Sequence, residues 1–207
     1  ARLGVDVNAR ASNGSSALLL AAAQELASDV VQTLIDLGAE TEVVDATGRT
    51  PLMISAAEGN RPDVVLLAAK ADVNARDNED HTALMFVVYK ADPEGAVKAL
   101  IQAGGDVNAA DRDGRTVLMC AADGGSADAV GQLVAAGASV GAKDDLGRTA
   151  LMWAAHGRMA PKDVEHRAMI ETLLTAGADR NAVDKEGHTA VTWAGYNGNT
   201  KMAELLK

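Results

Sequence analysis

Four histidines are the residues of this chain that could most readily carry acid–base chemistry or bind a metal ion. His81 and His188 each precede a threonine of a repeated segment, and three repeat junctions separate them, so they are not expected to meet. His166 follows Asp163 by three positions, a spacing at which two helical side chains could share a metal. No further ligand accompanies that pair, which we interpret as a solvated helix face. The remaining histidine, His156, has no catalytic partner in its neighbourhood.

The single Cys120 and the glycine-rich run 123–126 are the other candidates for chemistry. Cys120 has no histidine at a fixed spacing, and other copies of its segment carry Leu, Ile, Phe or Trp at this position. We therefore expect it to be buried for packing. The glycine-rich run lacks the lysine and the preceding strand of a phosphate-binding loop and is typical of a turn between helices. The sequence thus predicts no catalytic residue, no cofactor and no metal site.

Six near-copies of one short segment are the strongest pattern in the chain. Each is anchored by a hydroxyl residue, and these residues lie 34, 32, 34, 33 and 40 positions apart. The hydroxyl residues are Ser16, Thr50, Thr82, Thr116, Thr149 and Thr189. Such a period is typical of repeat proteins, whose units bury their apolar faces by stacking. The longest spacing indicates an insertion within 157–167, where a second helix is expected to extend backwards over 162–167.

One repeat can be interpreted residue by residue. The run 111–114 has Asp first and Gly fourth, as type I turns prefer. Thr116 is expected to cap a first helix with its hydroxyl, and Gly125 to break that helix. A second helix follows and ends at Gly137, where a left-handed backbone is expected. Each repeat therefore consists of a turn and two helices.

The chain resembles the ankyrin-repeat family over essentially its whole length. The resemblance is carried by Gly-x-Thr-x-Leu helix starts, by Leu-x-x-Gly-Ala type helix ends, and by repeated tails. These tails contain Asn8, Asn74, Asn108 and Asn181. The resemblance implies an all-α solenoid of stacked helix-turn-helix units with β-hairpin fingers, and asparagines that tie the hairpins by side-chain hydrogen bonds. We expect one domain over 1–207, with a partial unit at 1–14 and units at 15–48, 49–80, 81–114, 115–147, 148–187 and 188–207.

Two features depart from the family pattern. The family places a histidine three residues after the capping threonine, whereas this chain mostly carries methionine there. We expect these methionines in the core, because Met fills irregular gaps. Lys70 stands where a helix-ending glycine is expected, and a positive φ there would strain the backbone.

Composition restricts the partners. The net charge is −10 and the sequence pI is about 4.8, which disfavours nucleic acid as a partner and favours a protein with a basic or neutral face. The alternative interpretation is that the acidic surface only keeps an exposed solenoid soluble. The longest apolar run, Ala17–Ala23, is too short to span a membrane. Without a leader or a disulfide, an intracellular location is the default expectation. The chain begins inside a repeat without Met, so we expect a piece of something longer or a processed product.

The candidate protein-binding residues are those at the predicted fingertips and first-helix ends, which differ between copies. They are Arg49, Asn78, Glu79, His81, Tyr89, Lys90, Arg112, Asp113, Arg115, Asp123, Asp145, Leu146, Arg148, His156, Lys185, Glu186, His188 and Tyr196. An alternative for the arginines at 49, 115 and 148 is that each pairs with the aspartate four residues before it. Tyr89 and Tyr196 are expected to be exposed and to act as aromatic anchors.

The sequence therefore predicts a non-catalytic protein-interaction module, a scaffold or accessory subunit of a larger assembly. The alternative function is the targeting or regulatory arm of an enzyme whose catalytic domain lies outside this segment.

Overall fold

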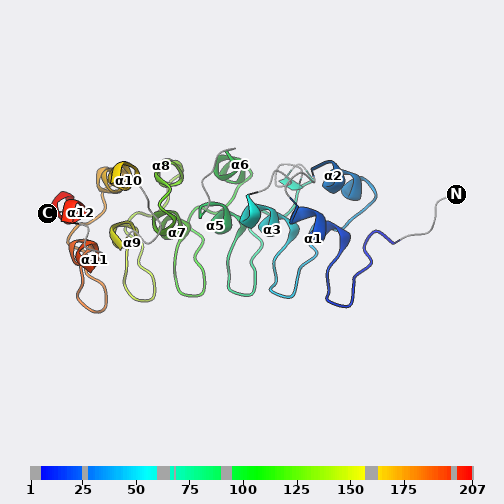
Figure 1. Ribbon diagram of the computed structural model, residues 1–207, viewed down its shortest axis with the longest axis horizontal. Coiled ribbons are helices and arrows are strands. Elements are labelled where there is room, and N and C mark those ends of the chain that lie inside the picture. The colour runs from blue at the N-terminus through cyan, green and yellow to red at the C-terminus, as the bar shows by residue number, and fades with distance from the viewer. Residues whose placement is uncertain are drawn as a thin grey trace. The chain divides into compact units, whose positions relative to one another are not determined.

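Short helices joined by tight turns make up the protein (Figure 1). The computed structural model describes residues 6–24, 28–59, 66–67, 69–89, 95–156, 163–196 and 200–206. The chain divides into two compact units. The N-terminal unit comprises Ala1–Val87 and Glu94–Gly105, and the C-terminal unit comprises Val88–Pro93 and Asp106–Lys207.

Short helices joined by turns make up the N-terminal unit in the segments that the structure describes. Its helices are α1 (Ala17–Ala22), α2 (Ser28–Asp36), α3 (Pro51–Glu58), α5 (Ala83–Val87) and α6 (Ala96–Gln102). The first helices α1, α3 and α5 pack in a row, while α2 packs on α1 and α6 packs on α5.

The C-terminal unit repeats this plan. Its helices are α7 (Val117–Gly124), α8 (Ala127–Ala135), α9 (Ala150–His156), α10 (Asp163–Thr175), α11 (Ala190–Tyr196) and α12 (Thr200–Leu205). The first helices α7, α9 and α11 pack side by side, and the second helices α8 and α10 pack on one another. The predicted repeats of two antiparallel helices are therefore confirmed.

The hydroxyl residues cap most, but not all, of the first helices. The side-chain oxygens of Ser16, Thr50, Thr116 and Thr189 accept a hydrogen bond from the amide three residues on, at 3.3 to 3.4 Å. The repeat pattern also predicts a side-chain cap at Thr82 and Thr149, and this prediction is wrong. Among the described residues, the hydroxyls of Thr82 and Thr149 are buried without a hydrogen-bond partner. Their backbone carbonyls accept the amide instead, at 3.0 Å, so the first turn tightens.

Left-handed residues end the second helices, as predicted. The helix-ending glycines 38, 104, 137 and 177 have φ between 90° and 93°. Lys70 takes the same role with φ 62°, which confirms the strained joint. A side chain in this conformation costs roughly 1 kcal/mol relative to glycine.

The asparagines of the repeat tails connect consecutive repeats within a unit. Asn8 donates to the carbonyl of Gly38 at 3.1 Å, and Asn108 donates to that of Gly137 at 3.4 Å. Their side-chain oxygens also accept backbone amides of the next repeat, at 2.9 and 2.8 Å. The side-chain bonding implied by the family resemblance is therefore confirmed for Asn8, Asn74 and Asn108, whose amide groups each donate to the glycine carbonyl that follows the next second helix.

The core contains the methionine stripe, as predicted. Met53, Met85, Met119 and Met152 are each at most 1% exposed. Cys120 is also buried, at 1% exposed, which agrees with the packing role expected for it. The equivalent residue of the first repeat, Leu20, is 59% exposed, so burial at this position depends on the repeat.

Helix α10 begins at Asp163, which agrees with the backward extension expected there; Lys162 lies outside the described residues. The prediction that His166 lies on a solvated helix face is wrong, because His166 is only 5% exposed. It precedes the buried Ile170 and Leu173 by four and seven positions, so it lies on the apolar face of α10.

Candidate protein-binding site

Tight hairpin turns, here called fingers, precede the first helices. The first, Ala11–Ser15, begins with alanine, and the other five described fingers begin with aspartate: Asp45–Arg49, Asp77–His81, Asp111–Arg115, Asp144–Arg148 and Asp184–His188. In each unit they extend from the first helices on the side opposite the second helices (Figure 1). Each leading aspartate uses Oδ1 to accept the amides two and four residues on, at 2.8 to 3.0 Å. The side chain thus closes the turn that the sequence predicts.

Neighbouring fingers of a unit are joined through their backbones. In the C-terminal unit, the amide of Lys185 donates to Leu146 and that of Asp145 donates to Asp113, both at 2.9 Å. In the N-terminal unit the amide of Asn78 donates to Thr47 at 3.0 Å. These bonds set the spacing of the tips within each unit.

The fingertips are exposed, as expected for a binding surface. The exposed candidates are Asn78, Glu79, Arg112, Asp113, Asp145, Leu146, Lys185 and Glu186. Leu146, a large apolar side chain, is 54% exposed. The candidate Lys90 lies outside the described residues.

Two of the predicted arginines pair with the aspartate of their own finger. Arg49 Nε lies 3.3 Å from Asp45 Oδ2, and Arg148 Nε donates to Asp144 Oδ2 at 2.8 Å. This pairing is the alternative that the sequence left open. His81 takes the equivalent position in its finger, with Nδ1 3.2 Å from Asp77 Oδ2.

Arg115 reaches beyond its finger to the first-helix ends of the C-terminal unit. Its Nη2 donates to Tyr89 Oη at 2.8 Å and to Asp123 Oδ2 at 3.1 Å. The prediction that Tyr89 is exposed is wrong, because its side chain is half-buried. Burial also raises the pKa of its hydroxyl above the ordinary value. Glycine at position 124 permits a close approach of the backbone, since a Cβ there would lie 3.1 Å from the carbonyl oxygen of Val88 and 3.2 Å from Tyr89 Cα.

Both tryptophans bind the buried carboxylate of a finger, which the sequence analysis missed. The indole Nε1 of Trp153 donates to Asp144 Oδ2, and that of Trp193 donates to Asp184 Oδ2, both at 3.1 Å. The two carboxylate side chains are 0% and 3% exposed. In both repeats the tryptophan follows the aspartate by nine positions, and this shared spacing is the signal that could have revealed the contact.

Asp184 stays ionised more readily than an ordinary aspartate. Burial by itself raises its pKa, but hydrogen bonds from the His188 amide, the Trp193 indole and the Glu186 amide outweigh that effect and lower the pKa below 3.8. The carboxylate is therefore a permanent acceptor for the indole near neutral pH.

Guanidinium groups cover the Trp153 ring. The Cζ atoms of Arg115 and Arg148 lie 4.2 and 4.1 Å from its centroid. Such cation–π contacts contribute about 1 kcal/mol each and restrict both side chains. Arg115 and Arg148 are therefore held by a ring as well as by carboxylates.

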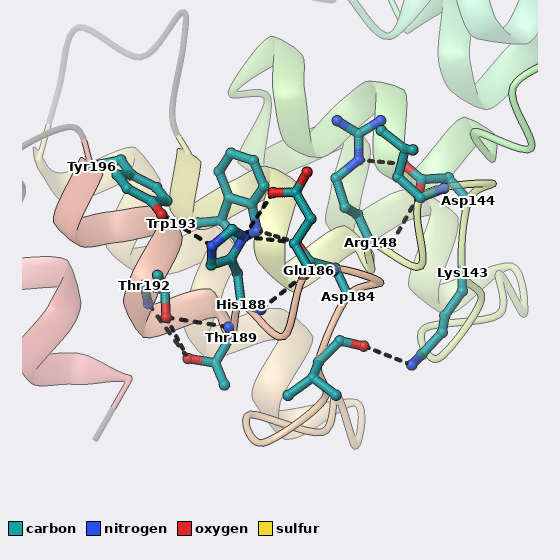
Figure 2. A network of polar contacts seen from close by, with 12 residues as sticks. Lys143, Asp144, Arg148, Asp184, Glu186, His188, Thr189, Thr192, Trp193 and Tyr196 are labelled. Carbon is teal, nitrogen blue, oxygen red and sulfur yellow. Dashed lines mark hydrogen bonds and ion pairs between the residues drawn. The ribbon is translucent and has the colours of Figure 1, made fainter.

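The ring contacts continue to the last repeat. His156 lies edge-on to Trp193, with centroids 5.2 Å apart. His188 shares a 3.0 Å hydrogen bond with Tyr196 through Nε2, and its Nδ1 lies 3.3 Å from Glu186 Oε2 (Figure 2). Tyr196 is 63% exposed, as predicted for an anchor. The structure thus brings together the candidates Arg115, Arg148, His156, His188 and Tyr196 with two tryptophans that were not among them.

The described residues of the site make polar and ring contacts with one another. Within the described residues, no three His, Cys, Asp or Glu side chains come close enough to hold a metal. Burial raises the pKa of the Cys120 thiol to about 11, so it remains protonated near neutral pH. No described helix is both long and apolar enough to cross a bilayer.

Comparisons with known proteins agree with this architecture. A family model described as ankyrin repeats in three copies matches residues 2–77, 64–144 and 84–164, and a single ankyrin-repeat model matches 146–185.

Two solved structures are similar over most of the chain. An ankyrin repeat domain from Acinetobacter baumannii AYE has 29% sequence identity and a TM-score of 0.78, covering 91% of this chain and 95% of its own. The ankyrin repeat domain of Bcl-3, described as a unique member of the IkappaB protein family, has 25% identity and a TM-score of 0.75. It covers 92% of this chain and 82% of its own.

Proposed function

Because this chain belongs to the ankyrin-repeat family, we propose that it captures a partner protein through the finger side of its C-terminal unit. Ankyrin repeats are generally protein–protein interaction modules, and ankyrin repeat domains are typically non-catalytic. The protein then acts as a scaffold or accessory subunit whose contact surface is built from fingertips and first-helix ends.

The location of the aromatic residues supports the C-terminal unit as the contact surface. Both tryptophans and both tyrosines belong to it, and Phe86 is the one aromatic residue of this class elsewhere in the chain. Trp, Tyr and Arg dominate the energetics of protein interfaces when they lie in well-packed surroundings. Here Trp153 packs with Arg115 and Arg148, and the exposed Tyr196 lies beside His188.

The exposed fingertips supply the rim of this surface. Leu146 and Tyr196 are large, exposed side chains that contact with a partner would desolvate. The net charge of −10 favours a partner whose face is basic or neutral overall. The surface would therefore combine an aromatic centre with a charged, hydrated rim.

The test is affinity capture from native extract with the double variant Leu146→Asp and Tyr196→Ala, followed by cross-linking of the retained complex. We expect capture to fall at least about tenfold, because two exposed anchors are removed without touching the core. Leu37→Asp is the matched control, because Leu37 is 67% exposed on the loop after α2. Undiminished capture by the double variant, with cross-links on the second helices, would place the binding surface elsewhere.

A further inference from the structure

A pocket of about 70 Å³ opens between the first helices α9 and α11 of the C-terminal unit. Arg148, Met152, Trp153, His156 and Trp193 line it. The ring of His156 lies edge-on to both indoles, at 6.5 Å from Trp153 and 5.2 Å from Trp193. The walls are therefore mostly apolar and aromatic, with one cation among them.

The indole walls are held in place before any ligand arrives. Each indole N–H is bonded to a buried carboxylate at 3.1 Å. Trp153 is also covered by two guanidinium groups. A pocket whose walls are already ordered binds a ligand with little loss of conformational entropy.

Arg148 supplies directed hydrogen-bond donors at the pocket. Its Nε is bonded to Asp144, and its guanidinium lies over Trp153. Within the described part of the chain, no hydrogen bond uses either of its terminal nitrogens. Figure 2 shows both terminal nitrogens pointing away from Asp144. Two parallel N–H donors of a fixed guanidinium match the two oxygens of a carboxylate.

The size of the pocket selects one side chain. A single water needs about 10–15 Å³ in this measure, and a cavity of about 150 Å³ holds a benzene molecule. A volume of about 70 Å³ lies between these limits and fits the end of an aliphatic side chain better than an aromatic ring.

We propose that this pocket holds one aliphatic side chain of the partner protein, and that a neighbouring carboxylate of the same partner segment pairs with the terminal nitrogens of Arg148. The inference rests on the proposed function and specifies the chemistry of the anchor. The carboxylate is compatible with an otherwise basic or neutral partner face, because charges more than about 8 Å away are largely screened at physiological salt. The nearest acidic group, Asp144, is 0% exposed and already accepts bonds from Arg148 and Trp153.

A random peptide library displayed on phage and selected on the complete chain tests the inference. We expect enrichment of peptides in which Leu, Ile, Val or Met is followed closely by Asp or Glu. The two tryptophans are the only ones in the chain, so their indole N–H signals in NMR spectra report directly on the pocket. Both signals should shift when a selected peptide is added.

Two changes then test the carboxylate contact. Replacing Asp by Asn in the peptide should weaken binding to the native protein at least about tenfold, and so should Arg148→Gln. Arg167→Gln is the matched control, because Arg167 is an exposed arginine of α10 paired with Glu171 at 2.8 Å. The peptide change keeps the test valid even if Arg148→Gln disturbs the fold.

The outcomes separate this inference from the proposed function. Selected peptides that are basic, or that leave both indole signals unmoved, would overturn the pocket assignment while leaving protein binding intact. Failure to enrich any peptide would also overturn it. The proposed function is judged independently, by whether Leu146→Asp with Tyr196→Ala abolishes capture of folded partners.

Discussion

The Asp45 finger of the N-terminal unit and the Asp144 finger of the C-terminal unit share one backbone design but hold their carboxylates differently. Both use Oδ1 to accept the amides two and four residues on. Asp45 is 25% exposed in its side chain and is paired with Arg49, whereas Asp144 is 0% exposed and also accepts the indole of Trp153.

The difference comes from one residue, nine positions after the aspartate. That position holds Ile54 in the N-terminal unit and Trp153 in the C-terminal unit. Isoleucine has no donor for the carboxylate, while the indole N–H is a donor that needs an acceptor when buried. The same repeat design can therefore contain an exposed finger, or a finger whose buried aspartate accepts a hydrogen bond from the first helix.

The largest effects on stability are expected from replacing the finger aspartates Asp144 and Asp45 by alanine. Asp144→Ala should lower the free energy of unfolding by about 3 kcal/mol, because it leaves a buried indole N–H and a guanidinium without their acceptor. Asp45→Ala should cost only about 1 kcal/mol, because its donors can reach water. Urea titration followed by circular dichroism measures both. Equal losses would mean that the indole contact adds nothing.

Replacing one glycine in each unit separates backbone strain from close packing. Gly48 and Gly187 have φ of 83° and 82°, so alanine costs roughly 1 kcal/mol at either position. A Cβ at Gly48 would also lie 2.9 Å from the amide nitrogen of Asn78, whereas none of the atoms near Gly187 comes within 4 Å. Gly48→Ala should therefore cost about twice as much as Gly187→Ala. A comparison of their thermal midpoints tests this ratio.

Lys70→Gly should strengthen the N-terminal unit. Lys70 has φ 62°, and glycine at this position relieves roughly 1 kcal/mol of strain, partly offset by the greater freedom of glycine in the unfolded chain. The equivalent joint of the C-terminal unit already has Gly137, with φ 90°. We expect a rise of a few degrees in the melting temperature. No rise, or a fall, would show that the lysine side chain makes a compensating contact.

The smallest effect on stability is expected from lowering the pH, and it should occur in both units. The pKa values of Asp45 and Asp184 are lowered, because hydrogen bonds outweigh the opposing effect of burial. A depressed carboxylate pKa stabilises the fold fully above the ordinary value of 3.8, and this contribution is lost as the pH falls through the lower folded-state pKa. The stability difference between the native protein and Asp184→Asn should thus shrink as the pH falls below the ordinary value of 3.8. A constant difference would contradict the shift.

Local patterns predicted the fold and the exposed tips. The hydroxyl period, the helix-ending glycines and the finger aspartates each act within a few residues of their own position, so their roles follow from nearby sequence. The methionine stripe was also predictable, because a position that is apolar in five of the six copies is expected to face the stacked neighbours. These inferences needed only the repeat length and the preferences of turns and helix ends.

The candidate site was less predictable, because its key contacts join different repeats. Tyr89 is half-buried where Arg115 and Gly124, both one repeat later, approach it. Arg115 lies over Trp153, again one repeat later, although its own finger offered an aspartate. His166 was assigned to a solvated face because no further metal ligand accompanies it in the sequence, whereas its position four residues before the buried Ile170 places it on the apolar face.

By itself, the sequence determined that this protein is a series of ankyrin repeats with exposed, variable fingertips, because turn, cap and period signals are short-range and are repeated along the chain. Only the tertiary structure decided that the two indoles form a pocket with Arg148. The physical reason is that a pocket between two repeats depends on how the side chains of both repeats pack together, which neither repeat specifies alone.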